Sequence, residues 1–187
     1  MLRCPEKEKD LWIKALFKEF EQLLDTKVFQ FIPKSSVPID RKIIRNRPVF
    51  RVKKDANNQP IKYKARLVVK GFMQVEGKDF QHTYASTSIP PTWRVILALA
   101  ASNNWEIEQI DFIGAFLNSE LSETIYMDIP DGFLEFTESL LTDRKLWSNI
   151  QRQRLLTLLK EAGFDPSIKQ AILLKKALYG LKQAPRE

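Results

Sequence analysis

The sequence has few of the residues that form disulfides or bind soft metals. Its 187 residues include one cysteine, Cys4, and one histidine, His82. A single cysteine excludes an internal disulfide, and one cysteine with one histidine cannot supply the ligands of a zinc site. A metal ion held by this chain would therefore need oxygen ligands, which favours magnesium or manganese.

Long hydrophobic runs are also missing. The longest run of apolar residues covers 95–101, which is far shorter than a membrane-spanning helix requires. The first ten residues, MLRCPEKEKD, lack the apolar segment of a secretory signal peptide. We therefore expect an intracellular protein, cytoplasmic or nuclear, with no membrane partner.

The patterns of apolar residues change type along the chain, and their share of 44% is that of an ordinary globular domain. Helical spacing at 8–25 is followed by strand-like alternation at 48–72, so we predict an α+β fold. In the first half of the chain we predict a helix at 8–25, a connector at 31–47, and a hairpin at 48–72 with its turn at 55–60. A buried helix capped by Thr92 and stopped by Asn103 and Asn104 should follow, and then a strand at 105–112. In the second half we predict a short helical turn leading into a strand near 124–129, a helix within 141–164 that has Gly163 at its C-terminal cap position, and a C-terminal strand or helix start followed by a turn.

Acidic residues are almost absent from the stretch 41–72. It holds eleven lysines and arginines against one aspartate, Asp55, although the net charge of the whole chain is only +7. The second predicted strand has two different faces, one with Tyr63, Ala65, Leu67 and Val69 and the other with Lys62, Lys64, Arg66 and Lys70, interrupted by Val68. Like charges on one face repel each other, so the pattern favours an anionic ligand over the alternative of a merely solvated surface.

The segment EQIDFIGAFLN at 108–118 places one carboxylate, Asp111, among apolar neighbours. A burial-prone carboxylate needs a helix cap, a cation or a metal ion to offset its loss of hydration. These residues alone leave all three open.

Three blocks occur in a fixed order: YKARLVVKGFMQVEGKDF at 63–80, IDFIGAFLN with TIYMDIPDGF at 110–133, and LLKKALYGLKQAPR at 173–186. Together they resemble the reverse transcriptase of Ty1/copia-type retrotransposons. The resemblance covers 6–187 and implies the fingers and part of the palm of a right-hand polymerase. It places the fingers hairpin at about 48–72 and the first catalytic strand of the palm at about 105–118.

The resemblance also implies roles for single residues. Asp111 would be the first catalytic aspartate and would bind Mg²⁺ (or Mn²⁺), with the carbonyl of Phe112 as an added ligand. The aromatic ring of Phe116 would lie under the sugar of the incoming nucleotide and exclude a ribose 2′ hydroxyl. The alternatives are an Asp111 that caps a helix or ends a strand and a Phe116 that is a core residue.

The remaining implied site residues are cations and loop residues. By resemblance, Lys62, Lys64 and Arg66 would hold the triphosphate. Gly180 and Lys182 would belong to a loop against the template and nucleotide, although this loop is also compatible with an ordinary turn. The implied partners are an RNA or DNA template-primer, deoxynucleoside triphosphates and the rest of a retrotransposon polyprotein.

The YxDD motif, which supplies further catalytic carboxylates in such enzymes, does not occur in the 187 residues. We therefore expect the chain to end before that segment and to be catalytically incomplete by itself. A different class of function is a non-catalytic nucleic-acid-binding remnant that uses the basic hairpin. A translated pseudogene without function is the third interpretation.

Overall fold

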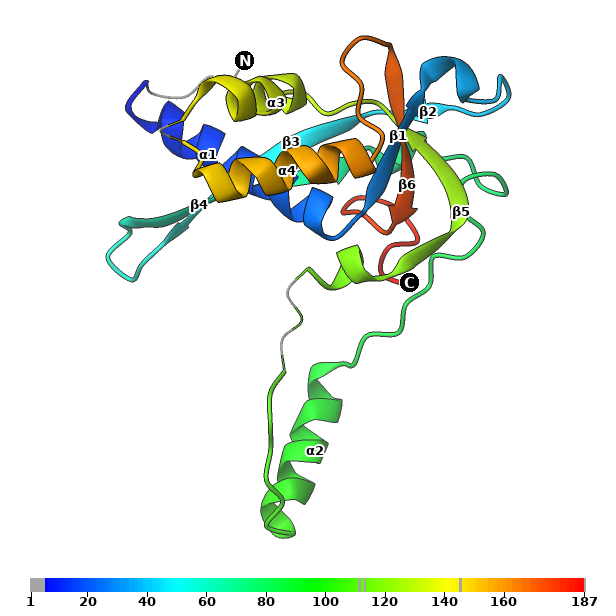
Figure 1. Ribbon diagram of the computed structural model, residues 1–187. Helices are drawn as coiled ribbons and strands as arrows, with labels where there is room; N and C mark the ends of the chain where they lie inside the picture. Colours follow the sequence, from blue (N-terminus) through cyan, green and yellow to red (C-terminus); the bar gives the residue numbers. More distant parts are fainter. Residues whose placement is uncertain (1–5, 111, 113, 145, 187) are drawn as a thin grey trace.

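The protein combines a four-stranded sheet, a separate hairpin and helices (Figure 1). The structure is a computed structural model that describes residues 6–110, 112, 114–144 and 146–186. The predicted α+β class is confirmed.

Helix α1, Glu6–Asp25, forms where the sequence repeats apolar residues at helical spacing. One side of the helix is buried in the core through Leu16, Phe17, Phe20, Leu23 and Leu24. The helix ends where Lys27 adopts a left-handed conformation with φ of 53°. Because α1 contacts both the hairpin and helix α3 (Phe133–Thr142), it joins the hairpin to the rest of the molecule.

The main sheet has the strand order β1-β6-β5-β2. Its strands are β1 (Phe29–Pro33), β2 (Ile43–Ile44), β5 (Glu120–Met127) and β6 (Gln170–Lys176). β6 runs antiparallel to both of its neighbours, whereas β2 is parallel to β5. The predicted connector at 31–47 is therefore wrong in part, because strands this short carry too few residues to show periodicity.

Two helices cover the core where the sequence predicted one. α3 is Phe133–Thr142 and α4 is Asn149–Glu161. The helix predicted at 141–164 is present as α4 but begins later than predicted, and α3 was not predicted. The later start is explained by Ser148, the N-cap of α4, whose side chain accepts a hydrogen bond from the backbone N–H of Gln151 in a capping box. Gly163, with φ of 80°, follows α4 as predicted.

The predicted hairpin is confirmed as β3 (Asn46–Lys54) and β4 (Pro60–Val69), which pair antiparallel. At its turn, the Asp55 carboxylate accepts hydrogen bonds from the backbone N–H groups of Asn57 and Gln59. The apolar face of the hairpin packs on α1, where the Trp12 ring contacts Phe50 and Tyr63 at 5.2 and 4.6 Å between centroids.

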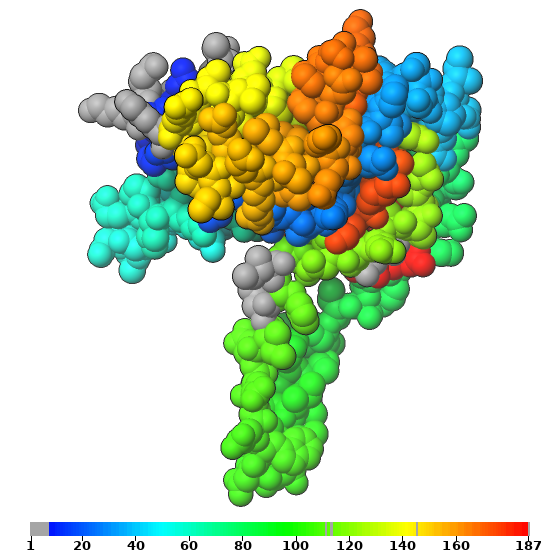
Figure 2. All heavy atoms as spheres, in the orientation of Figure 1, coloured from blue at the N-terminus to red at the C-terminus, as the bar shows by residue number. Residues whose placement is uncertain are grey.

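Helix α2, Pro90–Ser102, extends away from the other elements (Figures 1 and 2). The prediction of a buried helix is wrong, since Ala100 is its only buried residue. An apolar helix can be buried only if another surface covers it, and no element of the described chain does. The cap position is also corrected: it is Ile89 rather than Thr92, with prolines at the first helical positions. The stop after Ser102 is confirmed, and Asn103 is the C-cap.

The strand predicted at 105–112 is not present in the described residues of that range, which are 105–110 and 112. Residues 105–110 form neither helix nor strand, and Ile110 and Phe112 are exposed. A strand needs a neighbour for its backbone hydrogen bonds, and no described strand lies beside this segment. The helical turn at Ala115–Asn118 and the strand after it agree with the prediction. None of the described helices is long and apolar enough to cross a membrane.

Candidate nucleotide and nucleic-acid interface

The polar face of the hairpin carries cations from both strands. The register places Arg51 opposite Lys64 and Lys53 opposite Lys62. Opposite residues of an antiparallel pair lie on the same face of the sheet, so the cations predicted on β4 are joined by others on β3. We call this surface the basic hairpin face, and its residues are Arg47, Arg51, Lys53, Lys62, Lys64 and Arg66.

The six cations of the basic hairpin face are not neutralised by ion pairs within the described residues. The cross-strand pairs are therefore like-charged, which is destabilising when no anion is bound. Burial, with the positive charge of Arg66 as the second cause, lowers the pKa of the Lys64 ammonium. A bound polyanion would relieve the repulsion and favour the charged ammonium.

A buried carboxylate lies behind this face, at the free edge of β4. Glu19 of α1 is only 6% exposed and accepts a hydrogen bond from the backbone N–H of Leu67, at 3.0 Å. Burial raises the pKa of the Glu19 carboxyl, although the Leu67 hydrogen bond and the charges of Lys64 and Arg66 lower it. Glu19 therefore satisfies the strand edge and brings a negative charge near two of the cations.

The same strand edge is closed further along by the loop after β6. The backbone N–H of Val69 donates to the carbonyl of Tyr179 at 2.7 Å. Gly180 has φ of 92°, and a Cβ atom built on it would lie 2.2 Å from the Val69 carbonyl oxygen. Only glycine fits this approach, so the structure gives Gly180 a packing role at the predicted loop.

Two predicted site residues meet at the ring of Tyr179. The Arg66 guanidinium carbon lies 5.5 Å from the centre of this ring, and the Phe116 ring packs against it edge to face at 5.7 Å. Phe116 is half-buried and packs against the core. The structure thus brings Arg66, Phe116 and Gly180 together around Tyr179, with Lys64 on the same strand face as Arg66.

Lys182 lies on a different side of its loop. Its ammonium nitrogen is 4.5 Å from the centre of the Phe80 ring, and its backbone N–H donates to the Gln74 side chain. Lys62 is exposed and lies toward the tip of the hairpin, opposite Lys53. Neither residue contacts the cluster around Tyr179 in the described part of the chain.

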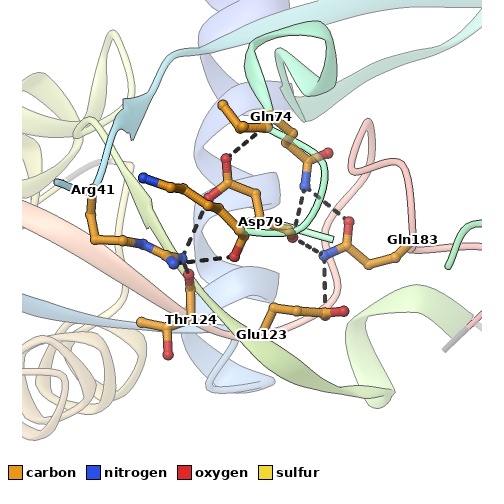
Figure 3. Close-up of polar contacts among 8 residues, drawn as sticks. Arg41, Gln74, Asp79, Glu123, Thr124 and Gln183 are labelled. Atoms are coloured by element: carbon orange, nitrogen blue, oxygen red, sulfur yellow. Dashed lines mark hydrogen bonds and ion pairs between the residues drawn. The ribbon is translucent and has the colours of Figure 1, made fainter. Parts of the chain in front are cut away.

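A polar network fixes the loop that carries Lys182 (Figure 3). The buried Gln183 side chain accepts a hydrogen bond from Gln74 and donates one to the Asp79 carbonyl, at 2.9 and 2.8 Å. The Asp79 carboxylate in turn pairs with Arg41 at 3.4 Å. Arg41, one of the eleven cations of the basic stretch, is therefore used to hold the fold.

The central residue of the predicted metal site, Asp111, lies outside the described residues. Phe112 is described and its side chain is 72% exposed. Within the described ranges, no group of three or more histidine, cysteine, aspartate and glutamate residues is placed to hold a metal ion.

Several residues of this interface were not found from the sequence. The cations of β3 carry a usable signal, since Arg47, Arg51 and Lys53 fall on alternate positions of a strand. Glu19 also has a signal, because it lies on the apolar side of an amphipathic helix. Tyr179 has none, because its role arises from contacts between segments far apart in sequence.

Comparison with known proteins gives the class of this chain. Residues 27–149 match the family model described as reverse transcriptase (RNA-dependent DNA polymerase). The chain belongs to this family. Among solved structures, none gives a significant match.

Its relatives are polyproteins of Ty1/copia-type retrotransposons. The chain is 34% identical to a retrovirus-related Pol polyprotein from transposon TNT 1-94 of Nicotiana tabacum, over 96% of this chain and 11% of that protein. It is 29% identical to the polyprotein from transposon RE2 of Arabidopsis thaliana and 26% identical to the Ty1-DR4 Gag-Pol polyprotein of Saccharomyces cerevisiae, each over 95% of this chain. It spans only 10% and 9% of those two proteins.

Proposed function

We propose that this chain contributes to RNA-directed DNA polymerisation by binding the incoming deoxynucleoside triphosphate and the template-primer. The observation that supports this most strongly is the basic hairpin face, whose six cations form no ion pair among the described residues. In a reverse transcriptase family member, phosphate groups are the anions that such a face would bind.

The two ends of the basic hairpin face suit different phosphates. Lys64 and Arg66 lie nearer the Phe116 and Tyr179 rings, so they would bind the triphosphate while Phe116 contacts the sugar. A guanidinium and an ammonium are both strong donors to phosphate oxygens. Cations toward the hairpin tip, such as Lys53, would contact the nucleic-acid backbone without reading its sequence.

The proposal includes Mg²⁺ or Mn²⁺ at Asp111. When bound, such an ion neutralises triphosphate charge and activates the primer hydroxyl. The described residues would contribute by binding and orienting phosphate and sugar. A non-catalytic nucleic-acid-binding module remains the second candidate, because the basic hairpin face would bind nucleic acid whether or not polymerisation follows.

A nucleotide titration tests the proposal. Calorimetry with dTTP, UTP and inorganic triphosphate should show that the chain binds all three and prefers dTTP. Lys64→Ala combined with Arg66→Ala should weaken triphosphate binding by about tenfold or more, since each charged hydrogen bond contributes about 1.5–3 kcal/mol.

The matched control removes the same charge from exposed positions of α1, through Lys14→Ala and Lys18→Ala, and should leave binding nearly unchanged. Equal weakening by both double variants would contradict a specific triphosphate site. Binding of dTTP no tighter than inorganic triphosphate would favour the non-catalytic module.

A further inference from the structure

Tyr179 lies between the two residues to which the proposed function gives different tasks. One neighbour is the Arg66 guanidinium, proposed to bind the triphosphate, and the other is Phe116, proposed to contact the sugar. The two rings are nearly perpendicular, at 87°, which is a favourable edge-to-face geometry. A single side chain therefore touches both parts of the proposed nucleotide site.

The backbone of Tyr179 is anchored to the strand that carries Arg66. Its carbonyl accepts a hydrogen bond from the Val69 N–H, and the following residue, Gly180, is in close contact with the Val69 carbonyl. The backbone at Tyr179 cannot move away from β4 without breaking this junction. The junction therefore holds the base of the Tyr179 side chain beside the strand that carries Arg66.

Besides the Tyr179 ring, the negative charge of Glu19 acts on Arg66, from beyond ion-pair distance. The Nε atom of Arg66 is buried and has no hydrogen-bond partner, and in the described chain the guanidinium forms no ion pair. The face of the Tyr179 ring is thus the contact that orients this cation. A guanidinium that is not held in an ion pair remains available to a phosphate.

We infer that Tyr179 is a positioning residue that sets the direction of Arg66 and the placement of Phe116, and so couples triphosphate binding to discrimination between deoxyribose and ribose. The inference rests on the proposed function. It assigns a task to a residue that the resemblance left without one.

The test compares Tyr179→Leu with Tyr179→Phe in the 187-residue chain, using calorimetric titration with dTTP, UTP and inorganic triphosphate. In Tyr179→Leu, the affinity for all three ligands should fall by about three- to tenfold, in the range of a cation–π contact. The ratio of dTTP affinity to UTP affinity should also fall toward one. Tyr179→Phe keeps the ring and should retain both affinity and ratio. Tyr126→Leu, at a half-buried tyrosine of β5, is the matched control and should change neither.

A double-variant cycle separates positioning from a loss of folding. In an Arg66→Ala background, Tyr179→Leu should no longer weaken binding of inorganic triphosphate, because its effect acts through Arg66. Additive losses, or a Tyr179→Leu chain that binds like the wild type, would overturn the inference while leaving the proposed function intact. A wild-type chain that binds no triphosphate would overturn both.

Discussion

Glu19 shows how one residue serves both the fold and the proposed site. Its carboxylate is buried, accepts from the Leu67 N–H and lies near the charges of Lys64 and Arg66. Because burial is the largest influence, the pKa of this carboxyl in the folded chain lies above its ordinary value of 4.5. The ionised form is therefore less favourable in the folded chain than in the unfolded one.

This shift predicts a pH-dependent difference between wild type and Glu19→Gln. Between the unfolded and folded pKa values the folded chain binds more protons, so the contribution of Glu19 to stability falls as the pH rises through that interval. Glutamine keeps an acceptor for the Leu67 N–H and does not ionise. Urea unfolding should show Glu19→Gln gaining stability relative to wild type from about pH 4 upward, starting near the unfolded pKa. A difference that is constant with pH would contradict the shift.

At the residue scale, the sequence predicts those features that depend on a single strand or helix, such as the face on which a side chain lies. Alternation along β4 was enough to place Lys64 and Arg66 on the face opposite Leu67. It could not show that Arg66 would meet Tyr179, because that contact depends on how the loop after β6 reaches the β4 edge. Gly180 was singled out by resemblance, but its left-handed backbone and close approach to β4 became apparent only in the fold.

Among the elements, α2 is the one whose environment disagrees most with its composition. Its apolar side chains are exposed, including Trp93, Val95, Ile96, Leu97 and Leu99. Exposed apolar surface of this extent tends to associate with other apolar surface. The helix itself is explained by its sequence, whereas its burial would require a covering surface that the described chain does not supply.

We accordingly predict that the 187-residue chain self-associates through α2. Val95→Glu combined with Leu99→Glu should shift the chain toward monomer in sedimentation velocity at a fixed concentration, because charge on this surface opposes its burial. The control adds the same charge at exposed apolar positions outside α2, through Leu134→Glu and Ile150→Glu. An equal shift in both double variants would assign the effect to net charge rather than to α2.

The hairpin and the segment 105–110 show why elements differ in predictability. The hairpin contains both of its strands and its turn within one stretch of sequence, so local pattern was sufficient to predict it. The strand expected at 105–112 depended on pairing with a distant segment. In the described structure 105–110 has no such partner, and its apolar residues do not produce a strand.

On the scale of the whole molecule, positive charge is concentrated on one projecting element. The stretch 41–72 has eleven basic residues against one acidic residue, whereas 73–168 has seven against fourteen. A nucleic acid would therefore be attracted to the hairpin and repelled by much of the remaining chain. This arrangement predicts that phosphate contacts are concentrated on the basic hairpin face.

The salt dependence of nucleic-acid binding tests this central claim most directly. Fluorescence anisotropy with a mixed-sequence single-stranded RNA should give a steep fall of log affinity with log salt concentration. Without nucleotide, Lys62, Lys64 and Arg66 are all free to contact RNA phosphates. Their replacement by Ala should then flatten the slope by about 2, since each lost phosphate contact on a single strand changes it by about 0.7. The matched removal of Lys14, Lys18 and Lys160, which are exposed on α1 and α4, should leave the slope nearly unchanged. An unaltered slope in the hairpin variant, or equal flattening in both, would contradict the assignment of nucleic-acid binding to the basic hairpin face.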